Sequence, residues 1–305
     1  MSHAAKPPVL LLLAGAALSG VVAAQGYLTA PLAPPENPVT AEKAILGKVL
    51  FWDEQLSSDG SMACGTCHIP SVGGAELRAG PGTRFPGPDG VFGTADDGFG
   101  SPGVVNTDGF GHFAPSTLFG LDPQVTGRYA PSPITAGYFQ DLFWDGRATS
   151  KFTDPITGAT AVASGGALES QSLGPLLSGV EMAEPARGFA DLSLRIGGAR
   201  PLALATNLPP DVLAALQAYP TYSDLFRQAF GTTDITPVRI AFALATYQRT
   251  LVADETPWDD FQRGIPGALS AQQQRGMAAF ETTAACAVCH TPPLFSTGGY
   301  HALAR

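Results

Sequence analysis

Two copies of one cysteine motif constrain this chain of 305 residues more than any other feature. The first copy is CGTCH at residues 64–68, the second is CAVCH at residues 286–290, and together they use all four cysteines. In a Cys-x-x-Cys-His motif the two thiols add to the vinyl groups of one haem, and the adjacent imidazole becomes an axial ligand of its iron. The sequence therefore predicts two covalently attached c-type haems, held by Cys64, Cys67, His68, Cys286, Cys289 and His290.

The same cysteines are compatible with a structural zinc site, with thioredoxin-like redox pairs or with two disulfides. Pairs of Cys-x-x-Cys motifs that bind zinc usually lie about 15 to 20 residues apart, and they do not need a histidine directly after the second cysteine. Disulfide exchange has no need of that histidine either, and plain disulfides require only an exported protein. Haem attachment explains both complete motifs, and it is the interpretation that we favour.

The first 24 residues have the pattern of a cleaved secretory signal peptide. Lys6 precedes an apolar run at residues 9–17, and Val22 and Ala24 stand at the positions that a signal peptidase reads. The apolar run is too short for a convincing membrane span, and an uncleaved anchor is the alternative. Because c-type haem is attached outside the cytoplasm, the predictions of haem and of a bacterial periplasmic location support each other.

Net charge narrows the range of partners. The chain has a formal charge of -9, and signal cleavage makes it one unit more negative because Lys6 is lost and no carboxylate is. An acidic surface disfavours binding to nucleic acid and to anionic membranes, so we expect neither partner, and no membrane contact after cleavage. The same surface favours association with a basic redox protein.

Periodicity predicts a mainly α-helical chain with long loops. The 36 glycines and 27 prolines make up about a fifth of the residues, which indicates many turns, and no strand pattern of any length is found. Helices are predicted at residues 41–51, 189–196, 212–219, 222–230, 238–251 and 271–280. Expected N-caps are Thr40, Asp211 and Ser270, and expected stops are Gly197 and Gly231.

Residues 71–108 are rich in glycine and proline and are predicted to be a loop. Within it, Asp89, Asp96 and Asp97 are separated by glycines, a pattern compatible with a calcium site but also with a solvated turn. The spacing does not match an EF-hand, so we favour the turn. His112 follows this loop and is a candidate sixth ligand of the first haem, although a lone histidine is usually an ordinary polar residue.

Several short segments resemble one family when they are taken in order. These are LGKVLFWD (46–53), LSS (56–58), the first haem motif, FWDGRA (143–148), VEM (180–182) and the second haem motif. Over about residues 41–293 the chain resembles the bacterial di-haem cytochrome c peroxidases, which include the MauG-type enzymes. The resemblance implies two mainly helical cytochrome c-like domains. The peroxidatic domain would span residues 25–252, and residues 253–305 would begin the electron-accepting domain.

The resemblance also implies an activity and roles for residues. A peroxidase of this family reduces hydrogen peroxide to water with electrons from a small cytochrome c or a cupredoxin, and homodimers are expected. His68 would be the proximal ligand of the peroxidatic haem and His290 that of the second haem. His112 would cap the first iron in the resting state, Trp144 would lie between the haems, and Glu181 would be the distal acid with Gln171 as its polar companion.

General chemistry agrees with the role that the resemblance gives to Glu181. Cleavage of the O–O bond of peroxide needs a group that takes a proton from one oxygen and delivers it to the other, and one well-placed carboxylate is suited to both steps. For an arbitrary glutamate, a surface position or a helix cap would be the better interpretation. A di-haem electron carrier without substrate chemistry has no use for a distal acid, and a MauG-like oxidase of a protein side chain is the third alternative.

Three features depart from the family pattern. The stretch between the first motif and His112 is longer than usual and rich in glycine. Tyr129 stands where the family commonly has an asparagine that helps to bind calcium, so that calcium is doubtful. Fifteen residues follow His290 and no methionine occurs after Met277, so a methionine ligand for the second haem is missing and we expect a truncated second domain. His301 as a replacement ligand and a disordered tail are the alternatives for this end, and we favour the tail.

Overall fold

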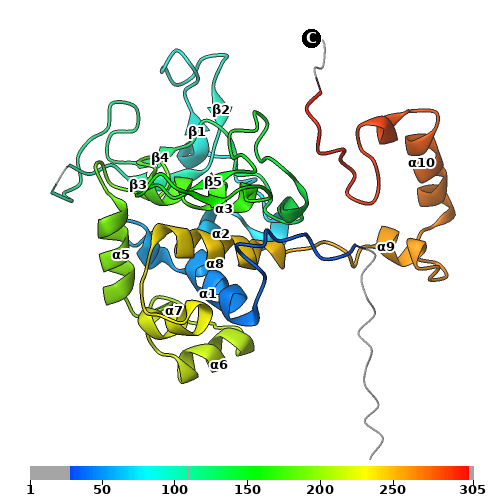
Figure 1. Cartoon of the computed structure of the whole chain (residues 1–305). Coiled ribbons are helices and arrows are strands. Elements are labelled where there is room, and N and C mark those ends of the chain that lie inside the picture. The colour runs from blue at the N-terminus through cyan, green and yellow to red at the C-terminus, as the bar shows by residue number, and fades with distance from the viewer. Residues whose placement is uncertain (1–27, 109, 302–305) are drawn as a thin grey trace, which may run out of the picture.

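The computed structural model describes residues 28–108 and 110–301, and the predicted signal peptide lies outside the described residues. The main helices are α1 (Ala41–Trp52), α2 (Cys64–Cys67), α3 (Ala167–Ser172), α4 (Gly174–Leu177), α5 (Phe189–Gly198), α6 (Pro210–Ala218), α7 (Tyr222–Phe230), α8 (Pro237–Arg249), α9 (Pro257–Gln262) and α10 (Ala271–Glu281). Long irregular segments connect many of them (Figure 1). The prediction of a mainly helical chain with long loops is confirmed.

The strands are very short and form three separate antiparallel pairs. These are β1 (Arg84–Phe85) with β2 (Gly98–Phe99), β3 (Pro102–Val105) with β4 (Pro123–Val125), and β5 (Phe152–Thr153) with β6 (Thr160–Val162). The first three strands lie in or at the end of the Gly- and Pro-rich segment that was predicted to be loop. No strand exceeds four residues in the part of the chain that the structure describes, which explains why no strand pattern was visible.

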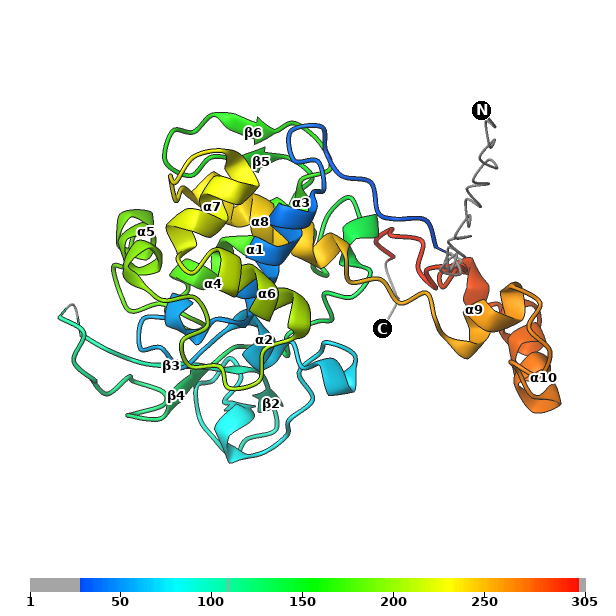
Figure 2. The same ribbon diagram turned by 90° about the horizontal axis from the view of Figure 1, so that it is seen from below.

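Helices α1 and α8 lie side by side at the centre of the main body (Figures 1 and 2). Their backbones approach so closely at Gly47 that a Cβ atom there would lie 1.9 Å from the carbonyl oxygen of Ala243. Only glycine permits this contact. The apolar core around the two helices also takes in residues of α5 and α7, and its fully buried side chains include Leu46, Leu50, Leu192, Phe226, Ile240 and Leu244.

Several predicted helix boundaries are confirmed by side-chain caps. Thr40 accepts a hydrogen bond from the amide of Lys43 (3.2 Å) at the start of α1, and Ser270 and Gln273 cap α10. Gly231 ends α7 with a φ of 80°. Asp211 was wrong as a cap, because Pro209 precedes α6 and Asp211 instead accepts a hydrogen bond from Lys48 (2.7 Å).

Two predicted helix ends also moved. Helix α5 continues through Gly197 to Gly198, so Gly197 does not stop it. Helix α8 ends at Arg249, before Leu251, because the last residues form a tighter turn in which the amide of Thr250 bonds to the carbonyl of Tyr247 (2.9 Å). Such differences of one or two residues at helix ends are common where the last turn frays.

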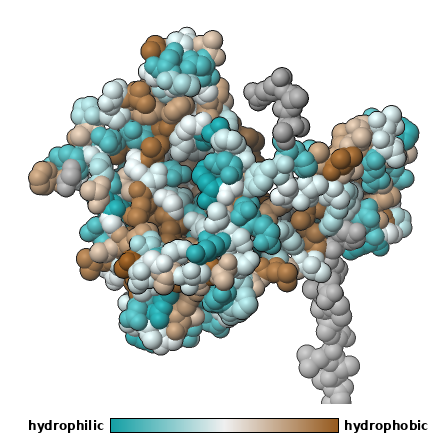
Figure 3. Space-filling view, turned by 45° about the horizontal axis from the view of Figure 1, so that its top comes forward, coloured by the Kyte–Doolittle hydropathy of each residue, from teal (hydrophilic) through white to brown (hydrophobic). Residues whose placement is uncertain are grey.

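Helices α9 and α10 lie apart from the main body and are joined to it by an extended segment after α8 (Figures 1 and 2). Helix α10 has no buried residue. Near the second haem motif, the ring of Phe295 contacts those of Trp258 and Phe280, with centroid distances of 5.1 and 5.9 Å. On the face shown in Figure 3, hydrophobic residues are interspersed with hydrophilic ones on both parts of the molecule. No helix within residues 28–108 and 110–301 is long and apolar enough to cross a membrane.

Candidate functional site

The first cysteine motif forms a single helical turn, α2, which packs against the end of α1. Cys64 and Cys67 are three residues apart, so they lie on the same side of this turn. Gly65 between them lies so close to the ring of Trp52 that a Cβ atom would be 2.3 Å from it. Gly65 therefore lets the turn lie against the indole of Trp52. The three-residue spacing of Cys64 and Cys67 places the two thiols on one side of the turn.

Both thiols of this turn are free and neutral. Burial raises the pKa of Cys64 to about 12 and that of Cys67 to about 11, which keeps them protonated at neutral pH. No disulfide joins Cys64 to Cys67 or Cys286 to Cys289. Among the described residues, no group of three or more His, Cys, Asp or Glu side chains is arranged to hold a metal ion, so the zinc alternative has no support in the geometry.

The histidine of the first motif has the environment expected of a haem ligand. The Nδ1 atom of His68 faces the carbonyl oxygen of Gly74 at 3.2 Å. Burial lowers the pKa of His68, which favours the neutral ring. When Nδ1–H donates to a carbonyl, Nε2 is left as the atom with a free electron pair for iron. The donor set of this turn therefore fits a c-type haem: two thiols on one side and an oriented imidazole directly after them.

The second motif repeats this arrangement in a more open setting. Its first cysteine begins the short 3-10 helix Cys286–Val288, and Nδ1 of His290 faces the carbonyl oxygen of Phe295 at 3.0 Å. The ring of Phe280 lies 6.4 Å from that of His290. His301 is exposed and pairs through Nε2 with the hydroxyl of Thr297 (2.9 Å). Both motif histidines thus have Nδ1 directed at a backbone carbonyl, the orientation of an imidazole that binds a metal through Nε2.

Glu181 lies near the first motif and is partly buried. Burial raises the pKa of its carboxyl group, although a hydrogen bond with Ser178 and the charge of Arg147 act in the opposite direction. The negative charge of Glu181 in turn contributes to the raised pKa values of Cys64 and Cys67, which places the carboxylate within electrostatic range of both thiols. The structure thus brings Glu181 within electrostatic range of the first motif, and its role as the distal acid stays a prediction.

Strand β3 fixes the backbone on both sides of this pair of groups. The amide of Val104 donates to the carbonyl of Glu181 (3.1 Å), and the carbonyl of Pro102 lies 3.4 Å from Sγ of Cys67. Between them, a Cβ atom at Gly103 would lie 1.8 Å from the carbonyl oxygen of Val180. The Gly- and Pro-rich segment is therefore not a simple loop at this point. Strand β3 contacts both the backbone of Glu181 and the thiol of Cys67, and so it fixes their relative positions.

Trp144 lies in a turn that the C-terminal segment contacts. The indole is 66% exposed, and the guanidinium of Arg128 stacks over it at 4.7 Å from the ring centroid. The preceding residue, Phe143, has a positive φ of 72°, and its carbonyl accepts a hydrogen bond from the hydroxyl of Tyr300 (3.5 Å). The structure therefore places Trp144 beside the segment that follows the second motif.

Two other predicted residues are less clearly connected to the site. Gln171 lies half-buried in α3. His112 lies on a surface loop with 78% of its side chain exposed, and its Nδ1 pairs with Asp108 at 3.2 Å. The ring of Phe110 lies 6.4 Å from that of His112. The structure thus shows His112 bound to its own loop, so its role as a ligand remains a prediction.

The three predicted calcium ligands stabilise turns. Asp96 accepts hydrogen bonds from the hydroxyl of Thr94 (2.6 Å) and the amide of Asp89 (3.3 Å). Asp97 accepts from the amide of Gly93 (2.8 Å) and pairs with Arg84 (3.3 Å). These contacts give the carboxylates of Asp96 and Asp97 partners within the loop, and calcium binding here stays an open alternative.

Sequence reasoning missed two ion pairs around this region in which the carboxylate is fully buried. Glu169 in α3 is fully buried and pairs with Arg249 at the end of α8 (2.7 Å), while Asn37 donates to the same carboxylate (2.8 Å). Glu76 is also fully buried and pairs with Arg78. The signal for the second pair was present: Glu76 and Arg78 are the only charged residues between His68 and Arg84.

Comparison with known proteins identifies relatives of this chain. The family model of the di-haem cytochrome c peroxidases matches residues 41–266. The methylamine utilization protein MauG of Methylorubrum extorquens is 30% identical over 270 residues, which cover 88% of this chain and 54% of that protein. The cytochrome c551 peroxidase of Pseudomonas aeruginosa is 27% identical over 257 residues, or 83% of this chain and 51% of that one.

A crystal structure of a MauG-like protein associated with microbial copper homeostasis has the same fold over 92% of this chain and 60% of its own length, with a TM-score of 0.56 and 22% identity. The chain spans about half the length of the curated relatives described above. The family match covers the first motif, the Trp144 turn and Glu181, but it ends before the second motif. The chain belongs to the di-haem cytochrome c peroxidase family.

Proposed function

We propose that this chain is part of a periplasmic di-haem peroxidase that reduces hydrogen peroxide to water. In this proposal each Cys-x-x-Cys-His turn holds one covalently attached haem c, and the domain around the first turn is the peroxidatic one. Electrons would come from a small cytochrome c or a cupredoxin through the second haem. The observation that carries the proposal is the partly buried carboxyl group of Glu181 near a turn whose His68 has Nδ1 directed at the carbonyl of Gly74.

Bound haem would supply the iron that binds peroxide and the electrons that reduce it. The chain itself would supply three functions. His68, held by the Gly74 carbonyl, would orient the haem from one side. Glu181 would take the proton from one peroxide oxygen and return it to the departing oxygen, for which a carboxylate in a partly dry site is suited. Strand β3 would hold the backbone of Glu181 in place beside the attachment turn.

The Trp144 turn supports an electron path between the two motifs. This turn lies beside the segment that follows the second motif, because the hydroxyl of Tyr300 donates to the carbonyl of Phe143, the residue before Trp144. We therefore propose Trp144 as the residue between the haems. On the family resemblance we also propose Gln171 as a polar companion of Glu181 and His112 as a resting-state ligand of the first haem. The acidic charge of the chain suits a basic electron donor. A homodimer is expected on the family resemblance alone.

A MauG-like oxidase of a protein side chain is the second candidate. It is supported by 30% identity to the methylamine utilization proteins MauG of Methylorubrum extorquens and Methylophilus methylotrophus. An electron carrier is the third, and it predicts no turnover of peroxide. Turnover of peroxide with a reduced cytochrome c donor therefore distinguishes the peroxidase from the carrier, and failure of the haem-loaded protein to consume peroxide would contradict the proposal.

The pH dependence of turnover tests the role of Glu181 in the unaltered protein. Burial raises the pKa of this carboxyl group, so its active carboxylate form appears at a higher pH than for an ordinary glutamate. We expect peroxide turnover to increase with pH, with an inflection above that ordinary value. Steady-state rates from pH 4 to 8, measured with donor in excess, check this expectation. A rate that stays constant down to the lowest pH would contradict it.

A further inference from the structure

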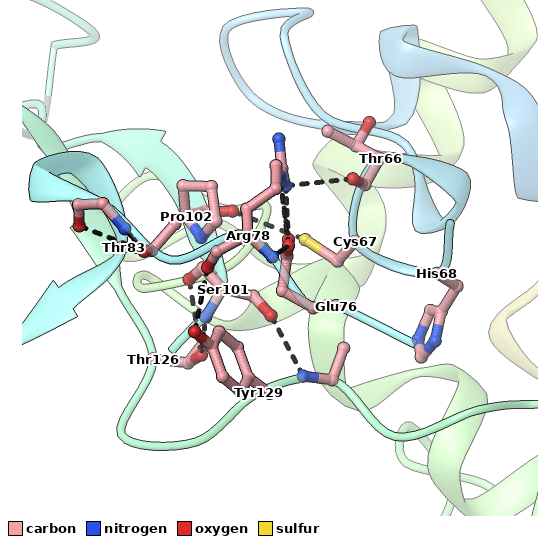
Figure 4. A network of polar contacts seen from close by, with 12 residues as sticks. Thr66, Cys67, His68, Glu76, Arg78, Thr83, Ser101, Pro102, Thr126 and Tyr129 are labelled. Atoms are coloured by element: carbon pink, nitrogen blue, oxygen red, sulfur yellow. Dashed lines mark hydrogen bonds and ion pairs between the residues drawn. The ribbon is translucent and has the colours of Figure 1, made fainter. Parts of the chain in front are cut away.

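An ion pair that the proposed chemistry does not use lies next to the first attachment turn (Figure 4). The Glu76 carboxylate is fully buried, and Nε of Arg78 donates to its two oxygens at 2.8 and 3.0 Å. Nη2 of Arg78 also contacts one of these oxygens. A planar guanidinium that holds both oxygens of a carboxylate fixes the orientation of both groups, which a point charge such as lysine does not.

The pair is tied to the attachment turn and to a distant loop. Nη2 of Arg78 donates to the carbonyl of Thr66, which lies between the two cysteines (3.2 Å). The amide of Glu76 donates to the carbonyl of Ala130 (3.1 Å), and the carbonyl of Arg78 accepts from the hydroxyl of Tyr129 (2.9 Å). Each residue of the pair is thus anchored both to its partner and to another part of the fold.

Glu76 also anchors the loop that orients His68. Gly74, two residues earlier, supplies the carbonyl that faces Nδ1 of His68, and its amide donates to the carbonyl of Ile69 (2.9 Å). Ile69 and Ala75 form an isolated antiparallel bridge. The loop from residue 69 to residue 76 is therefore closed by backbone hydrogen bonds and ends at the buried carboxylate. A shift of Glu76 would move the Gly74 carbonyl.

The charge of the pair at the attachment turn is not balanced. Arg78 has 47% of its side chain exposed and is screened by solvent, whereas Glu76 has 0% exposed. The negative end of the pair is therefore the one shielded from solvent, and a negative charge that solvent does not screen stabilises ferric over ferrous iron.

We propose that Glu76, held by Arg78, is a positioning residue for His68 that makes the reduction potential of the first haem more negative. It does so by fixing the hydrogen bond from His68 Nδ1–H to Gly74, which strengthens electron donation from the imidazole, and by adding a buried negative charge. The inference rests on the proposed attachment of haem to the first motif. It assigns to a residue outside the family motifs a role in the electronic state of the peroxidatic iron.

The test uses the full chain produced with covalent haem attachment, with Cys286 and Cys289 replaced by serine so that only the first haem is present. In this background Glu76→Gln should shift the haem midpoint potential in the positive direction. It should also lower the iron–histidine stretching frequency of the ferrous haem in resonance Raman spectra, because the His68 hydrogen bond weakens. Arg78→Lys keeps both charges but loses the paired hydrogen bonds of the guanidinium to the carboxylate. It should therefore shift the midpoint potential and the Raman frequency in the same directions as Glu76→Gln, by smaller amounts.

Asp97→Asn is the matched control, because Asp97 pairs with Arg84 in the same Gly- and Pro-rich segment. We expect it to leave the potential and the Raman frequency unchanged. If Glu76→Gln gives the same values as this control, the inference is overturned. If Glu76→Gln does not retain haem, Arg78→Lys decides by the same readouts. If the parent itself carries no haem on Cys64 and Cys67, the proposed function fails, and this inference fails with it.

Discussion

Glu181→Gln is expected to lower peroxide turnover of the haem-loaded protein by about 10²- to 10⁴-fold, the range for loss of a general acid–base residue. Glutamine keeps the size of the side chain but cannot exchange a proton at the reacting oxygens. The change also removes a partly buried group whose charged form burial already disfavours, so the fold should tolerate it. Rates of donor oxidation with and without peroxide measure the effect.

The matched control is Glu184→Gln, three residues along the same segment. Glu184 lies near the loop of His112, since a Cβ atom at Gly111 would be 3.5 Å from its carboxylate, and no role in proton transfer is assigned to it. We expect this variant to keep turnover within about threefold of the parent, a much smaller change than the loss of a general acid–base residue causes. Equal rates for Glu181→Gln and the parent, at equal haem content, would remove Glu181 from the mechanism.

Glu169→Leu is expected to lower the free energy of unfolding by about 3–5 kcal/mol, because it leaves the buried guanidinium of Arg249 without its partner. The two side chains are 0% and 2% exposed and are joined by two hydrogen bonds of 2.7 and 2.9 Å. The pair links α3 to α8, and Gln248 adds a bond to Ser172 (3.0 Å). Denaturant titration followed by circular dichroism measures the loss.

A second substitution tests whether the loss comes from the unpaired charge. Glu169→Leu combined with Arg249→Met should recover most of the lost stability, since buried ion pairs can often be replaced by apolar groups. Asp224→Asn, which breaks the exposed pair with Arg227 on α7, serves as a control and should cost less than about 1 kcal/mol. If the double variant is no more stable than Glu169→Leu alone, the buried charge is not the cause.

Much of the fold follows from local sequence signals. Thr40 and Ser270 cap helices as predicted, because a hydroxyl next to a helical pattern satisfies a free amide in almost any context. Asp211 failed as a cap because the two preceding residues are prolines, and proline at the first helical position starts the helix earlier. Asp211 is then free to pair with Lys48, a contact between distant segments that no local pattern contains.

The residues of the candidate site also differ in whether a local sequence signal predicts them. Cys64, Cys67 and His68 were found because the chemistry of attachment fixes their spacing along the chain. Glu181 was found only through the family resemblance, since its nearness to the first motif depends on strand β3, which is too short to leave a pattern. Glu169 was missed because its burial depends on where Arg249, 80 residues away, folds. Glu76 was missed although its partner Arg78 stands only two residues away in the sequence.

The central claim is that the two cysteine motifs each hold one haem. Intact-mass measurement of the protein produced with covalent haem attachment, followed by peptide mapping, tests it most directly. We predict two haems per chain, one on the peptide with Cys64 and Cys67 and one on the peptide with Cys286 and Cys289. A chain with the mass of the bare polypeptide, or with its cysteines joined in disulfides, would contradict the account.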